Sequence, residues 1–121
     1  ATWNLLEPSA GAALAEASAE GWGVIVKEVL ANGRLTDRHG GGRLGHLRAH
    51  AAAVGASVET VAVAAALSQP WADIVLSGAV TYDHLRAHIA APDVVVDVDQ
   101  LASIAEPAPE YWRRRELLRW T

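Results

Sequence analysis

The chain has 121 residues, a length that suits one domain with a modest core. Its net charge of −4 argues against a nucleic-acid binder, because such proteins normally present a net basic face. The absence of cysteine excludes disulfides and thiolate metal sites, and no apolar run approaches the roughly 20 residues that would span a bilayer.

The first part of the chain alternates strand-like and helix-forming stretches. Residues 2–7, TWNLLE, are predicted to form a strand, and Ser9 is a candidate N-cap for a helix that Gly21 closes. The β-branched run within residues 23–28, GVIVKE, predicts a short buried parallel strand. Residues 37–45, DRHGGGRLG, are predicted to form a loop because they are polar and rich in glycine.

Two helices are expected next, and each has a local boundary signal. The first is predicted from about Leu44 to Ala53 and ends at Gly55, a typical C-terminal glycine. Ser57 is predicted to cap the second helix, which stops before Pro70 because the residue before a proline disfavours helix.

The last part of the chain contains one more predicted strand and several helical segments. Residues 72–78, ADIVLSG, form a short apolar run that ends in a Ser-Gly turn, and residues 80–91 are predicted to be helical. Residues 94–99, VVVDVD, alternate in polarity and fit either a strand or an extended loop. Residues 100–120 are predicted to be helical segments split by prolines.

Short apolar strands separated by helices indicate an α/β fold with a parallel sheet. Three such strands would leave both sheet edges unpaired and the apolar faces half covered. We therefore expect the chain to be a processed or truncated part of a longer protein.

The Ser77-Gly78 turn after the third predicted strand is the clearest candidate binding feature. It places backbone N–H groups and a helix N-terminus at the carboxyl end of a strand, where a phosphate is favoured. Most strand-to-helix turns bind nothing, so the pattern is weak by itself.

The order of four segments resembles the C-terminal part of the aldo-keto reductases, from Thr2 to Trp120. The segments are WNLLEPS, GVIVKEVLANGRL, the long stretch AAAVGASVETVAVAAALSQPWADIVLSGAVTYDHLRAHIAA, and EYWRRRELLRW. That family has a (β/α)₈ barrel with its active site at the carboxyl ends of the strands. The resemblance implies that residues 1–121 form a single partial barrel, of three β-α units (its sixth to eighth strands) and a helical tail, with the N-terminal strands absent.

The resemblance also implies a function for the longer parent protein. The family transfers a hydride from NADH or NADPH to a carbonyl, assisted by Tyr, Lys, Asp and His side chains that would lie in the absent half. We therefore expect no catalytic residue and no metal site in this chain, and no activity from the chain alone. The expected partners are a nicotinamide cofactor and either the missing half or further copies of the chain, in the cytoplasm. The alternative is a non-enzymatic binding or structural module that self-associates to cover its sheet edges.

Nine residues are expected to bind the cofactor, because they match positions that do so in the family. They are Leu30, Asn32, Gly33, Arg34, Ser77, Gly78, Thr81, His84 and His88. The match is imperfect: Gly78 stands where the family often has a basic residue, and His84 stands where it often has Arg. Because histidine is a poorer phosphate partner than arginine, contacts to a 2′-phosphate are weakened and the choice of NAD or NADP is left open.

The pentapeptide HLRAH occurs at His46–His50 and again at His84–His88. Histidines four residues apart share a helix face and can chelate a metal, but the sequence offers no third ligand nearby. Solvated helix histidines are the expected explanation for both copies. Contact with the cofactor adenosine is the alternative for the second copy, and the first copy has no assigned function.

Overall fold

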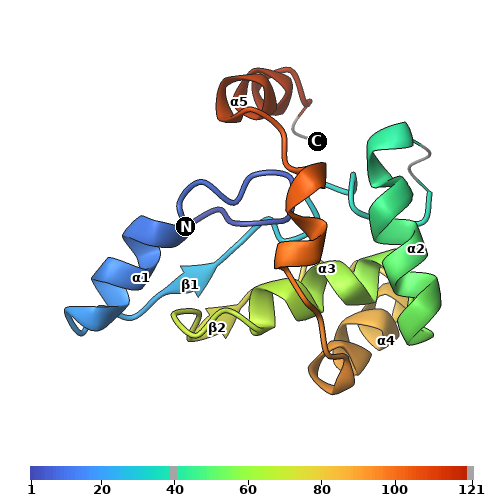
Figure 1. Ribbon diagram of the computed structural model, residues 1–121, viewed down its shortest axis with the longest axis horizontal. Helices are drawn as coiled ribbons and strands as arrows, with labels where there is room; N and C mark the ends of the chain where they lie inside the picture. The colour runs from blue at the N-terminus through green and yellow to red at the C-terminus, as the bar shows by residue number, and fades with distance from the viewer. Residues whose placement is uncertain (39–40, 120–121) are drawn as a thin grey trace.

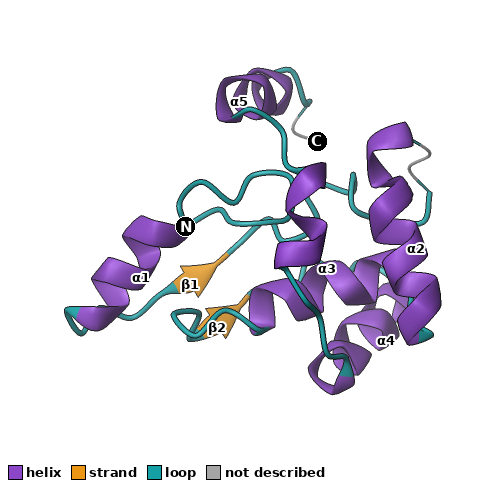
Figure 2. Cartoon of the chain, viewed as in Figure 1, coloured by secondary structure: helices purple, strands orange, loops and turns teal. Residues whose placement is uncertain are grey.

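The computed structural model describes residues 1–38 and 41–119, and about half of the chain is helical. Short helices dominate the arrangement, as Figures 1 and 2 show. The elements in chain order are α1 Gly11–Ala19, β1 Ile25–Val26, the 3₁₀ helix η1 Gly42–Leu44, α2 Gly45–Val54, α3 Val58–Leu67, β2 Ile74–Val75, α4 Tyr82–Ala90, η2 Ala91–Asp93, η3 Asp99–Ile104 and α5 Ala108–Glu116.

The sheet consists of two parallel strands of two residues each. β1 and β2 lie in register, with Ile25 beside Ile74. One isolated parallel bridge joins Thr2 to Lys27, and the described residues form no third strand. The expectation of a partial (β/α)₈ barrel with three β-α units is therefore wrong.

The expected first strand fails because only residues 1–3 pair with the segment around Lys27, and residues 4–7 turn back on themselves. The backbone N–H of Glu7 donates to the carbonyl of Asn4 at 3.1 Å, and the Asn4 side-chain oxygen accepts from the N–H groups of Leu6 and Glu7 at 3.0 Å. Backbone groups that are used in a turn cannot also form a strand ladder. Leu5 and Leu6, whose apolar side chains suggested a strand, lie in this turn and are buried in the core.

The ends of α2 and α3 follow the local signals in the sequence, whereas the predicted Ser9 cap of α1 is wrong, because the N-cap is Ala10 and no side chain caps it. The Ser57 hydroxyl accepts from the Thr60 N–H at 3.0 Å, so the predicted cap of α3 is confirmed. Gly55 adopts a left-handed φ of 68° at the end of α2, which confirms the predicted terminator. The predicted helix after β2 is also confirmed, as α4.

Helix α3 is the centre of the core. It is buried on all sides from Val58 to Ala66, and it contacts both α2 and α4 (Figure 1). The Trp3 and Trp71 rings pack edge to face with their centroids 5.8 Å apart, which joins the N-terminal turn to the segment before β2. In contrast, α1 buries no residue.

The C-terminal part has no strand. Residues 94–98 form a loop rather than a strand, as the second alternative predicted, and Val94, Val96 and Val98 pack partly against the core. Pro107 separates η3 from α5, as expected, whereas Pro109 lies in the first turn of α5. Of the expected loop at 37–45, residues 39–40 lie outside the described residues and 42–44 form η1.

Within residues 1–38 and 41–119, no single helix is long and apolar enough to cross a membrane. The consecutive helical segments Gly42–Val54 and Val58–Leu67 are together long and apolar enough, by length and composition only, and the angle between them is 89°.

Candidate functional site

A cleft of about 540 Å³ lies at the carboxyl ends of the two strands. The loop after β1 forms one wall, and the turn after β2 with the start of α4 forms the other. The lining residues are Glu28, Val29, Leu30, Asn32, Gly33, Thr36, Leu76, Ser77, Gly78, Val80 and His84. Polar groups are thus set among four apolar side chains, a composition that is common in small-molecule sites.

Six of the nine predicted cofactor-binding residues line this cleft. They come from two stretches more than 40 residues apart: Leu30, Asn32 and Gly33 from the first wall, and Ser77, Gly78 and His84 from the second. Parallel pairing explains their meeting, because the carboxyl ends of parallel strands lie at the same edge of a sheet.

The wall after β1 has an unusual backbone. Glu28, Ala31 and Asn32 have positive φ values of 59°, 49° and 56°, and Gly33 follows at 86°. Non-glycine residues adopt this region only where their surroundings enforce it. Here the Asn4 side-chain amide donates to the Glu28 carbonyl at 3.0 Å and fixes the start of the wall.

Glu28 lines the cleft, and its carboxylate is held by two neighbouring side chains. The Arg115 guanidinium binds both of its oxygens, at 2.8 and 3.0 Å, and the Asn32 amide donates to it at 3.2 Å. The hydrogen bond from Arg115 holds the pKa of Glu28 below its ordinary value, against an opposing effect of burial. None of the lining residues is Lys or Arg, so His84 is the only lining side chain that can carry a positive charge.

Three predicted residues lie outside the lining. Arg34 points to the other side of its loop, where it forms an ion pair with Glu106 and stacks 5.9 Å from the Tyr111 ring centroid. Thr81 caps α4 by accepting from the His84 N–H at 3.2 Å. His88 is buried behind the cleft wall. Their predicted contact with a cofactor stays a prediction.

A smaller cleft of about 260 Å³ lies on the Arg34 side of the same loop. It is lined by Ala31, Asn32, Arg34, Tyr111, Arg114, Arg115 and Leu118, and it shares Asn32 with the larger cleft. The three guanidinium groups are met by two carboxylates, those of Glu28 and Glu106, so the local balance of charge is positive.

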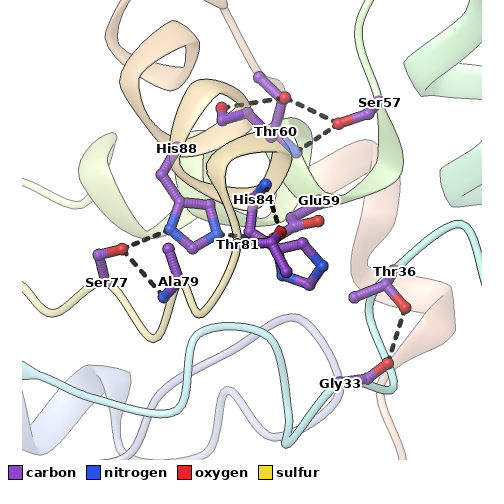
Figure 3. Close-up of polar contacts among 11 residues, drawn as sticks. Gly33, Thr36, Ser57, Glu59, Thr60, Ser77, Ala79, Thr81, His84 and His88 are labelled. Atoms are coloured by element: carbon purple, nitrogen blue, oxygen red, sulfur yellow. Dashed lines mark hydrogen bonds and ion pairs between the residues drawn. The ribbon is translucent and has the colours of Figure 1, made fainter.

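The sequence did not indicate a buried chain of hydrogen bonds behind the cleft. The Ser77 hydroxyl lies 2.6 Å from Nδ1 of His88, and Nε2 of the same ring lies 2.8 Å from Oε1 of Glu59 (Figure 3). The distance of 29 residues between Glu59 and His88 gives no pattern by which the contact could be found.

The two HLRAH copies have different surroundings. His46 is exposed, whereas Nε2 of His50 is buried without a hydrogen-bond partner in the described residues. In the second copy, His84 and His88 both face Glu59, at 3.3 and 2.8 Å. In the described ranges, no group of three or more His, Cys, Asp or Glu side chains is arranged to hold a metal ion.

No family model matches the chain, and no curated protein matches it. The chemistry of the site is therefore argued from the geometry of these residues.

Proposed function

We propose that the larger cleft binds the adenosine part of a nicotinamide dinucleotide. The observation that carries the proposal is the meeting of six residues, from two distant stretches, that the resemblance to the aldo-keto reductases had marked as cofactor contacts. Their position at the carboxyl ends of parallel strands is where α/β proteins commonly bind nucleotides. The apolar side chains of Leu30, Leu76 and Val80 offer a surface for a base, and Asn32 and Ser77 offer hydrogen bonds for a ribose.

The charges of the two clefts suggest how the dinucleotide lies. The pyrophosphate would sit toward Arg114 and Arg115 in the smaller cleft, because guanidinium groups suit phosphate oxygens. The loop that carries Asn32 lies between the two clefts and would pass under the ligand. Because no residue that lines the larger cleft is Lys or Arg, free ribose hydroxyls fit better there than a 2′-phosphate. We therefore expect NADH to bind more tightly than NADPH.

The chain by itself is proposed to bind the cofactor without reducing a carbonyl. Family members use a tyrosine as proton donor, and neither tyrosine lines the larger cleft. Tyr82 is exposed, and the buried Tyr111 hydroxyl accepts from the Asn4 amide at 3.0 Å. Hydride transfer to a carbonyl therefore belongs to an assembly that supplies the proton donor. A cytoplasmic location, where NADH is at hand, is part of the same proposal.

Titration of NADH, NADPH and ADP-ribose tests this proposal, with nicotinamide and tryptophan fluorescence as readouts. We expect saturable binding of NADH and of ADP-ribose. Gly78→Leu should weaken NADH binding at least tenfold, because it adds bulk to the cleft wall where a new Cβ meets no atom within 4 Å. Gly23→Leu is the matched control, since Gly23 is equally open but lies outside the cleft. Equal affinity in the two variants, or no saturation with NADH, would contradict the proposal.

A non-enzymatic, self-associating module is the second candidate, and one observation favours it. Ile25 and Ile74 lie side by side on the sheet, yet half of each side chain is exposed, at 50% and 53%. A second copy that covers this face would bury both. Sedimentation should then show a dimer that Ile74→Glu abolishes, while Val95→Glu, at an exposed position away from the strands, leaves it intact. A monomer at every concentration would remove this candidate.

A further inference from the structure

The linked side chains Ser77, His88 and Glu59 have the connectivity of a hydrolytic triad. The Ser77 hydroxyl lies at the cleft, the imidazole of His88 lies behind it, and the carboxylate of Glu59 lies beyond the ring (Figure 3). His88 and Glu59 are both buried, whereas Ser77 is exposed. A nucleophile that is open to the cleft is thus backed by a buried base and a buried acid, the arrangement that activates serine in several unrelated folds.

The hydrogen bonds define the proton positions. A carboxylate only accepts, so Nε2 of His88 carries a proton and donates it to Glu59. In the neutral ring Nδ1 is then an acceptor, and the Ser77 hydroxyl donates to it at 2.6 Å. The ring is used in the opposite sense from the usual serine protease, in which Nε2 faces the serine. Both ring nitrogens can act as the base, so the chemistry is the same.

The backbone beside Ser77 offers a donor for the developing oxyanion. Among the described residues the Gly78 N–H has no hydrogen-bond partner, and Gly78 directly follows the nucleophile, as oxyanion-hole donors do in α/β-hydrolases. The Ala79 N–H donates to the Ser77 oxygen at 3.3 Å, which leaves the hydroxyl proton directed to His88.

We propose that Ser77 is the nucleophile of an esterase or acyl-transfer activity in this cleft. Ser77 Oγ forms a bond to the carbonyl carbon of the ester, and its proton passes to Nδ1 of His88. The C–O bond to the alcohol then breaks, and the alcohol leaves with that proton. Water repeats the sequence on the acyl-serine and releases the acid, and no oxidant or reductant is needed.

The cleft limits the substrate class. Glu28 and four apolar side chains line it, and no lining residue is Lys or Arg, so small uncharged carboxylic esters fit better than acidic ones. His84 also lies 3.3 Å from Oε1 of Glu59, so two histidines share the carboxylate. Glu59 acts through His88 and is a positioning residue.

The full chain should be treated with a fluorophosphonate and its intact and peptide masses measured. The expected result is one adduct, on Ser77, with loss of fluoride. p-Nitrophenyl acetate should release a burst of p-nitrophenolate close to one equivalent. Ser77→Ala should abolish both signals, whereas Ser103→Ala, at an exposed serine outside the cleft, should change neither. Since Ser77 is exposed, its variant is expected to fold, which circular dichroism checks.

The histidine contribution is tested with His88→Gln, and His46→Ala serves as the surface control. Labelling of Ser77 should slow at least about 100-fold in the first variant and be unchanged in the second. Glu59→Gln should slow labelling while the melting temperature stays near that of the parent chain, and Glu59→Asp should restore part of the rate. An unlabelled parent chain, or equal labelling after Ser77→Ala, would overturn the proposal. The labelling experiments do not depend on NADH binding, so failure of the esterase proposal can be distinguished from failure of the dinucleotide proposal.

Discussion

Nε2 of His88 lies 2.8 Å from Oε1 of Glu59, and this buried hydrogen bond fastens α4 to the first turn of α3. The same ring reaches Ser77 at the cleft, so the contact joins the helical core to the wall of the candidate site. The Thr60 hydroxyl adds a second link nearby by donating to the Ala87 carbonyl at 3.0 Å. The position of α4, and with it the cleft, depends on these two contacts between helices.

Replacement of Glu59 by alanine should destabilise the fold. The change leaves the Nε2 proton of His88 buried without its acceptor, and an unsatisfied buried donor costs about 1–3 kcal/mol. Urea unfolding measures the loss. Glu16→Ala is the control, because Glu16 is exposed on α1, and it should change the free energy of unfolding by less than about 0.5 kcal/mol. Equal effects of the two variants would show that the buried contact contributes nothing.

Acid should weaken the fold through Glu28 and Glu106. Hydrogen bonds from Arg115 and Arg34 respectively lower the pKa of these two carboxyls below the ordinary value of 4.5. A lowered pKa in the folded state means that the unfolded chain takes up the proton first. The stabilisation is therefore complete above about pH 4.5 and is lost as the pH falls through the folded pKa values.

Urea unfolding between pH 7 and pH 3 measures this dependence. Glu106→Gln should flatten the acid limb, because it removes one of the two carboxyls whose pKa is lowered in the folded state, and Glu16→Gln should leave the slope unchanged. An acid limb that is as steep in Glu106→Gln as in the parent chain would contradict the assignment.

Asn4 should be among the most sensitive polar positions. It is fully buried and links the N-terminal turn to the cleft wall at Glu28 and to Tyr111 of α5. Asn4→Ala removes these contacts and leaves several buried groups unpaired, at a cost on the order of 2–4 kcal/mol. Thermal unfolding measures it, with the exposed Gln100→Ala as the control. A variant as stable as that control would mean that the network adds no net stability.

Substitution of Gly55 and of Gly45 by alanine should change the stability in opposite directions. Gly55→Ala should destabilise by about 1 kcal/mol, because its φ of 68° is unfavourable for any residue with a Cβ. Gly45→Ala should stabilise by roughly 0.4–1 kcal/mol, because Gly45 lies in α2 with a helical φ of −54°. A new Cβ meets no atom within 4 Å at either site, so chemical denaturation compares backbone effects alone. Shifts of the same sign would contradict the explanation.

Local chemistry made the end of α2 and the start of α3 predictable. The cap at Ser57 and the glycine at Gly55 act within one turn of the chain, so short-range sequence carries the whole signal. Part of the candidate site was predictable for a related reason: a Gly33 loop and a Ser77-Gly78 turn that each follow an apolar run must meet if those runs pair in parallel. The sequence alone determined these pieces.

Only the tertiary structure decided how far the strands extend and what stands behind the cleft. An apolar run becomes a strand only where a neighbour accepts its hydrogen bonds, and Asn4 turns residues 4–7 away from that role. Likewise, Glu59 sits beside His88 because α3 packs on α4, a long-range contact that leaves no periodic trace in the sequence. Hydrogen bonds between distant segments depend on packing of the whole core, and a local pattern cannot encode them.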